Sequence, residues 1–246
     1  MKRMLIYHVI GTLEWHHITR SLQSLRRQDI HWETLVLYNG GQFPDEKILL
    51  AMSTAGVIEM FDEVNIYPYD VATPKSASAD WYVQMQNIGG ADRYLVHKAD
   101  FYLADGVCKA FEMLPGGTWF VPFNKFDMKS RAELEDFERY AQCSWIEALH
   151  QPDRGTYERH LGKLAIPFYQ RPNVDGTMHG YTDSVRAHYA PSAKERQTRW
   201  GVAWSIRELQ KQVPFIWDDR FFALHMWHET PDRDDWNKNT SPSERF

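Results

Sequence analysis

A carboxylate stands at the end of an apolar run in the middle of the chain. The stretch YLVHKADFYLADG covers residues 94–106, and its first residues have the character of a buried β-strand. Lys98 and Asp100 follow directly, where that strand should end. Carboxylate oxygens are hard ligands of the kind that divalent cations prefer. The alternative is that Asp100 only caps the next turn.

A second group of reactive residues lies near the end of the chain. The segment PFIWDDRFFALHMWHE, residues 214–229, begins as a possible strand and ends in the pair His225 and His228. It also carries Asp218 and Asp219. Imidazole is a common metal ligand, and a carboxylate can accept a proton. The alternative for the pair is one exposed and one packed histidine.

In the first half of the chain, predicted strands alternate with predicted helices, and these elements must position the residues named above. Apolar runs predict strands over residues 4–10, 33–41, 63–70, 93–100 and 118–126. Helical spacing predicts helices over residues 15–28, 45–56, 80–90 and 105–117. This alternation predicts an α/β protein whose mostly parallel sheet has helices on both faces.

Ligands of such sheets bind at the carboxyl ends of the strands. We therefore expect one edge of the sheet to collect the residues that follow the strands, which are Gly11, Thr12, Asn39, Gly40, Asp70 and Asp100. The sequence NGG at 39–41 is equally typical of a plain turn.

The second half is less regular. Helices are predicted over residues 131–150 and 194–213, with short strands and turns over 162–189. The tail, residues 230–246, is polar, and we expect it to be loosely ordered. We find no internal repeat and no linker that divides the chain.

Composition narrows the function classes. The 246 residues carry a net charge of −5, which argues against a protein coated in positive charge for nonspecific nucleic-acid or membrane binding. The two cysteines do not form a metal-site spacing. No apolar run has the length of a membrane span, and the amino terminus lacks a signal-peptide pattern, so we expect a cytoplasmic protein.

Five segments together resemble a known family. They are SLQSLRRQ (21–28), LVLYNGG (35–41), QMQNIGGA (84–91), RYLVHKAD (93–100) and HMWH (225–228). In this order and spacing they resemble the GT-A nucleotide-sugar glycosyltransferases of the family 2 type. The resemblance covers about residues 3–126, and more loosely 175–229.

The resemblance implies one GT-A domain over residues 1–229, with a donor half at about 1–126 and an acceptor half at about 127–229. It implies sugar transfer from a nucleoside diphosphate sugar, for which we expect UDP, to an acceptor hydroxyl. It also implies a divalent cation, Mn²⁺ or Mg²⁺, that neutralises the diphosphate.

The resemblance also assigns site residues. Asp100 matches the last residue of the family's Asp-x-Asp motif, which touches the metal, and His225 or His228 would complete the coordination. Lys98 replaces the first acidic residue, which puts the metal requirement in question and favours a direct phosphate contact. The donor-binding set implied is Gly11, Thr12, Asn39, Asp70, Lys75, Lys98 and Asp100.

The family's usual catalytic base is not present. Many members carry a Glu-Asp pair in a segment whose nearest match here is RWGVAWS, residues 199–205, without acidic residues. An inverting transfer needs a carboxylate near the acceptor hydroxyl. Asp183 is the first replacement that we consider, and Asp218 or Asp219 is the second.

The acceptor side is basic and aromatic around residues 181–211. Tyr181, Arg199, Trp200 and Trp204 combine positive charge with stacking faces, as nucleic-acid strands require. A modified base in DNA is therefore one candidate acceptor, extruded from the duplex. Glycan, lipid-linked and protein acceptors stay open, and so does an amphipathic helix with a solvated charged face.

Two other functions stay open. Lys98 and the missing acidic pair are compatible with an inactive glycosyltransferase-like domain that binds a nucleotide or glycan. A nucleotidyltransferase shares the sheet order, but its Gly-rich loop with lysine is absent here. A P-loop and a dinucleotide fingerprint are absent as well.

Overall fold

The structure is a computed structural model. It describes residues 1–10, 13–28, 30–68, 88–103, 105–127, 130–132, 135, 179–186, 213–226 and 228. No helix in these ranges is long and apolar enough to cross a membrane.

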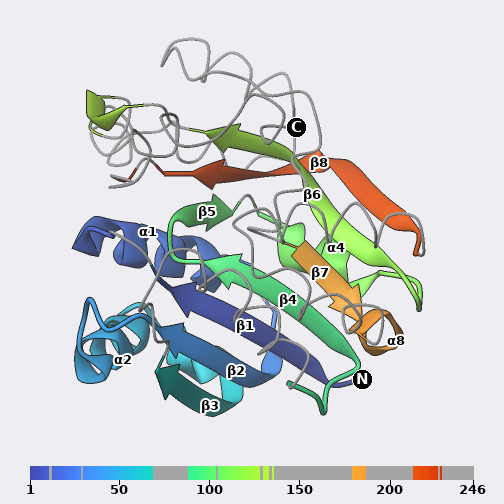
Figure 1. Cartoon of the computed structure of the whole chain (residues 1–246), viewed down its shortest axis with the longest axis horizontal. Helices are drawn as coiled ribbons and strands as arrows, with labels where there is room; N and C mark the ends of the chain where they lie inside the picture. Colours follow the sequence, from blue (N-terminus) through green and yellow to red (C-terminus); the bar gives the residue numbers. More distant parts are fainter. Residues whose placement is uncertain are drawn as a thin grey trace, which may run out of the picture.

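One mixed sheet of eight strands organises the described residues, in the order β3-β2-β1-β4-β7-β6-β8-β5 (Figure 1). The strands are β1 (Arg3–Val9), β2 (Trp32–Asn39), β3 (Phe61–Pro68), β4 (Arg93–Lys98), β5 (Phe101–Leu103), β6 (Trp119–Asp127), β7 (His179–Thr182) and β8 (Phe215–His225). Strands β3, β2, β1 and β4 are parallel to one another. Strand β7 is antiparallel to β4 and β6, β8 is parallel to β6, and β5 is antiparallel to β8. The predicted parallel sheet is thus confirmed for the first half of the chain.

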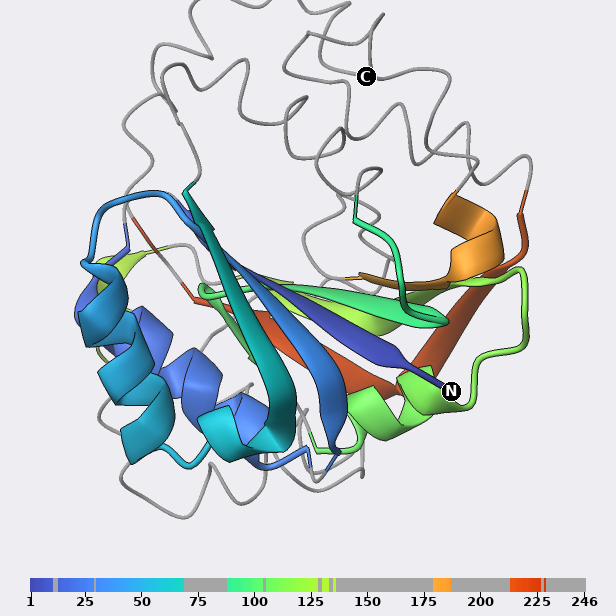
Figure 2. The same ribbon diagram turned by 90° about the horizontal axis from the view of Figure 1, so that it is seen from below.

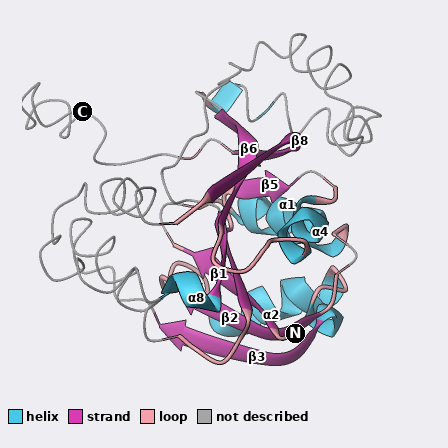
Figure 3. Ribbon diagram, turned by 90° about the vertical axis from the view of Figure 1, so that its right-hand side faces the viewer, coloured by secondary structure: helices cyan, strands magenta, loops and turns pink. Residues whose placement is uncertain are grey.

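Three helices cover the same face of this sheet (Figures 2 and 3). The helical segments described are α1 (Trp15–Arg26), α2 (Asp45–Thr54), η1 (Ile58–Met60), α4 (Val107–Glu112) and α8 (Asp183–Arg186). Helices α1, α2 and α4 share the covered face, and α8 lies on the other side. Helix α1 buries Ile18, Leu22 and Leu25, whose spacing of three and four residues gives it one apolar side.

The core forms where these helices meet the strands. Alternate residues of β1 and β2 point toward the helices, among them Leu5, Val9 and Leu35, which are fully buried. Helix α2 contributes Ile48 and Met52 to the same cluster. This packing fixes α1 and the central parallel strands as one unit.

The carboxyl ends of the central strands coincide. Val9 of β1 pairs with Asn39 of β2, and His8 of β1 pairs with Lys98 of β4. The expected common edge therefore exists, and it receives the turn that carries Asp100.

Several predicted elements differ in extent. The helix predicted over 105–117 is limited to Val107–Glu112, and the strand predicted over 63–70 begins earlier, at Phe61. The three residues of β5 were missed because so short a strand has no readable alternation. Helices predicted over 80–90, 131–150 and 194–213 lie largely or wholly outside the described residues, as does the tail.

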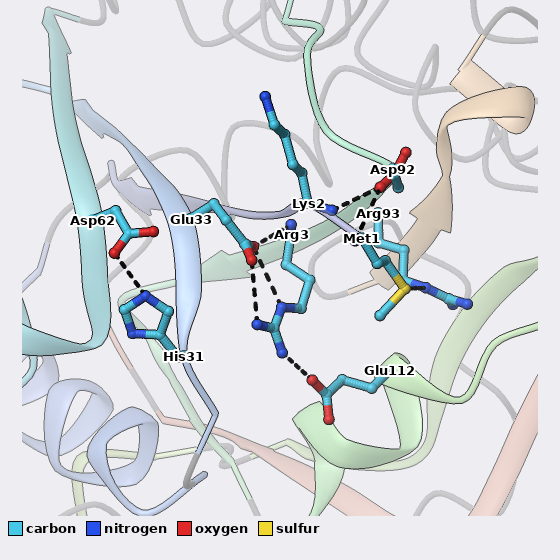
Figure 4. Close-up of polar contacts among 9 residues, drawn as sticks. All are labelled: Met1, Lys2, Arg3, His31, Glu33, Asp62, Asp92, Arg93 and Glu112. Carbon is cyan, nitrogen blue, oxygen red and sulfur yellow. Dashed lines mark hydrogen bonds and ion pairs between the residues drawn. The ribbon is translucent and has the colours of Figure 1, made fainter.

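An ion cluster joins three elements at the opposite, amino-terminal edge of the sheet (Figure 4). The guanidinium of Arg3 in β1 contacts Glu33 of β2 at 3.3 Å and also Glu112 of α4. Burial would lower the pKa of Arg3, but the two glutamates raise it on balance. Burial likewise raises the pKa of Glu33, while Arg3 lowers it by more. The cluster ties β1, β2 and α4 together away from the candidate site.

Candidate functional site

Asp100 occupies the turn between β4 and β5, directly beyond the parallel edge. The backbone holds this turn from both sides. The amide of Ala99 donates to the carbonyl of His8 on β1, and the amide of Met226 donates to the carbonyl of Asp100, each at 2.8 Å. The side chain of Asp100 is only 7% exposed. A buried carboxylate at this position is fixed before any ligand arrives.

The two late histidines converge on this carboxylate. His225 ends β8 and pairs with Phe101 of β5, which brings it beside Asp100 although the two are 125 residues apart in sequence. Its Nε2 lies 3.2 Å from Asp100 Oδ2, and Nε2 of His228 lies 3.3 Å from the same oxygen. The His225 ring stacks on Phe101, with centroids 4.8 Å apart. The structure therefore brings together all three predicted metal ligands.

The electrostatics of Asp100 are those of an ionised group. Burial by itself would raise the pKa of Asp100, but His225, His228 and Lys98 hold it well below its usual range. The Oδ1 atom of Asp100 is buried and has no hydrogen-bond partner among the described residues. An unsatisfied buried carboxylate oxygen is costly, so it suits a site that a ligand completes.

A divalent cation fits this group. The ligand atoms of the three residues lie within 4.8 Å of one another. Two ligand atoms that each lie about 2.1 Å from the same ion are roughly 3 Å from each other. The nitrogens of His225 and His228 lie 3.2 and 3.3 Å from Asp100 Oδ2, which is close to that spacing. The three side chains would occupy one side of the ion and leave other coordination positions open.

A buried polar chain lies beneath the site and was missed from the sequence. His97 of β4 is completely buried, and its Nε2 lies 3.0 Å from Ser21 Oγ of α1. Tyr7 of β1 donates to the same Ser21 oxygen at 3.0 Å. Burial lowers the pKa of His97 to about 3, although the nearby Asp100 acts to raise it. His97 is therefore neutral. The sequence feature that could have revealed it is a histidine inside the apolar run before Lys98.

Asn39 reaches the predicted edge, but its side chain is used by the turn. Its amide nitrogen donates to the carbonyl of Phe43 at 2.9 Å and to the carboxylate of Asp45. Its Oδ1 accepts from the amide of Gly41, which adopts a left-handed φ of 81°. These contacts favour the plain-turn interpretation of NGG over a donor contact.

Asp183 lies at the wrong end of the sheet to act on chemistry at Asp100. Thr182 pairs with Arg93, the first residue of β4, whereas Asp100 follows the last. The six residues of β4 put the two carboxylates about 20 Å apart. Asp183 instead accepts from Tyr94 at 3.0 Å and pairs with Arg186 at 2.8 Å. This location corrects its prediction as the base.

Asp218 is also far along its strand. It pairs with Pro122, five residues before Asp127, which pairs with His225. Five ladder positions span about 17 Å, too far for a base that serves the same centre. The side chains of Asp218 and Asp219 lie outside the described part of the chain. No catalytic base is assigned among the described residues.

Tyr181 does not offer a face to an acceptor. It is completely buried and stacks on Tyr94, with centroids 5.0 Å apart and planes 12° apart. Its predicted acceptor contact is therefore corrected to a packing role in the sheet. The remaining predicted site residues lie outside the described residues and are Gly11, Thr12, Asp70, Lys75, Arg199, Trp200 and Trp204.

Comparisons with known proteins bear on the fold. No family model and no curated protein matches the sequence. Among solved structures, S. aureus TarS superposes with a TM-score of 0.51 at 10% identity, covering 96% of this chain and 38% of TarS. The fold is of the GT-A type. At this identity the likeness shows the fold alone, and this chain spans well under half of TarS.

Two other solved structures resemble the chain less closely than TarS does. The inositol-1-phosphate CTP transferase of T. maritima has a TM-score of 0.49 at 11% identity, covering 94% of this chain and 90% of its own. The mannosyltransferase PcManGT of Pyrobaculum calidifontis, solved in complex with GDP-Man and Mn²⁺, has a TM-score of 0.48 at 9% identity, covering 94% and 58%.

Proposed function

We propose that this protein is a glycosyltransferase that moves a sugar from a nucleoside diphosphate sugar to an acceptor hydroxyl. One observation carries the proposal. Buried Asp100 and the partly buried His225 and His228 form a cation-type group at the carboxyl edge of parallel strands in a GT-A fold. Ligands of such sheets bind at that edge.

The chemistry follows from the charge that develops in the reaction. When the bond between the sugar and the diphosphate breaks, negative charge grows on the leaving diphosphate. When bound, a divalent cation supplies positive charge that neutralises this group. Asp100 and the two histidines would hold that ion, and Lys98 would add a second positive charge beside it. Because Asp100 is buried and already ionised, the site needs little rearrangement to act.

The donor set favours Mn²⁺ over Mg²⁺. Mg²⁺ prefers oxygen ligands and keeps much of its water, whereas imidazole nitrogen suits first-row transition ions better. Two of the three ligands here are imidazole nitrogens. We therefore propose Mn²⁺ as the metal.

The donor nucleotide and acceptor are narrower parts of the proposal. We propose a UDP-sugar on the sequence resemblance, and a hexosyl or pentosyl group as the sugar transferred. A modified base in DNA is the acceptor suggested by the basic and aromatic residues Arg199, Trp200 and Trp204.

Nucleotide binding tests the central claim. A ligand that binds only the folded protein raises the melting temperature. We expect one nucleoside diphosphate, with UDP tried first, to raise the melting temperature in the presence of Mn²⁺. Asp100→Asn should lose this shift. Asp105→Asn is the matched control, because Asp105 lies in the same stretch but forms a surface ion pair with Arg27.

Release of the nucleoside diphosphate from the sugar donor then separates an enzyme from an inactive binding domain. Turnover that requires Asp100 supports the enzyme, whereas binding without turnover supports the inactive alternative. A panel of nucleoside diphosphates that gives no shift at millimolar concentration, with or without metal, would overturn the proposal.

A further inference from the structure

The candidate site carries an unusual balance of charge. Lys98 ends β4, and Asp100 follows two residues later in the adjoining turn. Lys98 pairs with His8 of β1 at the same edge of the sheet, and its positive charge is one of the influences that lower the pKa of Asp100. Among the described residues, no carboxylate forms an ion pair with Lys98. With His225 and His228 neutral, as metal ligands must be, the charges of Asp100 and Lys98 cancel.

This charge balance disfavours the binding of a divalent cation in the absence of another ligand. A divalent ion would enter a group of net charge near zero and would lie in the field of the Lys98 ammonium. Like charges at short range in a partly buried site repel strongly. A diphosphate brings at least two negative charges to the same edge, and these offset both the ion and Lys98. Each ligand thereby removes the electrostatic obstacle to the other.

We propose that Lys98 makes cation binding conditional on the diphosphate, so that metal and donor bind as a cooperative pair. The inference rests on the proposed function, because it takes a nucleoside diphosphate as the partner of the ion. Binding free energies are linked reciprocally, so the nucleotide must raise the affinity for the metal by the factor by which the metal raises affinity for the nucleotide. An acidic residue in place of Lys98 would give the site a charge of −2 and allow it to hold the ion alone.

Equilibrium binding measures this coupling without any turnover. Free Mn²⁺ is counted by electron paramagnetic resonance during titration of the protein, with and without saturating UDP, or the diphosphate selected by the melting panel. Isothermal titration gives the affinity for the nucleotide with and without Mn²⁺. We expect both affinities to rise by about 10- to 100-fold in the presence of the other ligand.

Three variants locate the effect. Lys98→Asp should bind Mn²⁺ alone more tightly than the parent and reduce the coupling to a few-fold. Lys98→Gln removes the charge without adding an acid and should give an intermediate coupling, which serves if the aspartate variant does not fold. Lys109→Gln is the control, because Lys109 is an exposed lysine on α4. It should keep the coupling of the parent.

The results separate the two claims. Tight binding of Mn²⁺ to the parent protein without nucleotide would overturn the role of Lys98, and so would equal coupling in the parent and both Lys98 variants. Nucleotide binding that ignores the metal would also overturn it, while leaving a donor site. Failure of every nucleoside diphosphate to bind, with Mn²⁺ present, would instead overturn the proposed function.

Discussion

The buried histidine beneath the site should make folding sensitive to acid. His97 is completely buried, and its pKa is lowered to about 3 mainly by burial. In the unfolded chain a histidine titrates near 6.5. Between these two values the unfolded chain takes up a proton that the folded protein refuses. Stability is therefore lost as the pH falls below about 6.5, and the loss continues down to about 3.

The size of the effect follows from the two pKa values. Each unit of pH inside this window costs about 1.4 kcal/mol, because the unfolded state alone is protonated. Lowering the pH from 7 to 5 crosses about 1.5 units of the window. His97 by itself should then remove about 2 kcal/mol from the free energy of unfolding. Above pH 7 the residue is neutral in both states and contributes no pH dependence.

Urea unfolding at pH 7 and pH 5 tests this prediction in the parent protein and in His97→Gln. The glutamine amide can still reach Ser21 but does not titrate. Other titrating groups affect both proteins alike, so the difference between their pH effects isolates His97. The parent should lose about 2 kcal/mol more than the variant between the two pH values. Equal losses in the two proteins would show that His97 is not held neutral by burial.

Three further predictions concern packing, ion pairing and thiol reactivity. Gly180→Ala should destabilise by about 1–3 kcal/mol in urea unfolding, because a Cβ there would lie 2.5 Å from a buried phenylalanine ring, while Gly116→Ala, with no atom within 4 Å, should change little. Arg3→Met should cost about 1–2 kcal/mol in the same assay, since it leaves two half-buried glutamates without their partner, and an unchanged midpoint would show that the cluster is not stabilising. Burial raises the pKa of the Cys108 thiol, so in a Cys143→Ser background it should react with DTNB only as the protein unfolds; rapid labelling of the native protein would contradict the burial.

The parallel half of the fold could be predicted because its signals are local. Strands β1 and β2 are each an apolar run followed by a helix with apolar spacing, and such units join in only one common way. The order of β7, β6, β8 and β5 could not be predicted in the same way. These strands pair across long separations, and β5 and β7 have only three and four residues. Runs that short carry no periodicity that distinguishes a strand from a loop.

The site was predictable only in part, for a related reason. The family resemblance joined Asp100 to His225 and His228, which no local pattern could do across 125 residues. It said nothing of the direction of the strand before Asp183, which was considered as the base although it lies at the edge opposite Asp100. Asn39 was placed at the correct edge, but the sequence could not show that its amide is already used by the turn.

The architecture makes the candidate site depend on the docking of a late strand onto an early one. Asp100 belongs to the parallel half, and its backbone is held there by β1 through the carbonyl of His8. Of its two partners, His225 ends β8 and His228 follows three residues later, and the end of β8 is set by pairing with the short β5 and by the bond from Met226 to the Asp100 carbonyl. Without β8 the carboxylate would remain at the edge without the imidazoles that keep it ionised at low pH. The Asp100–His225–His228 group therefore requires both halves of the chain, even though the four parallel strands β3, β2, β1 and β4 all belong to the first.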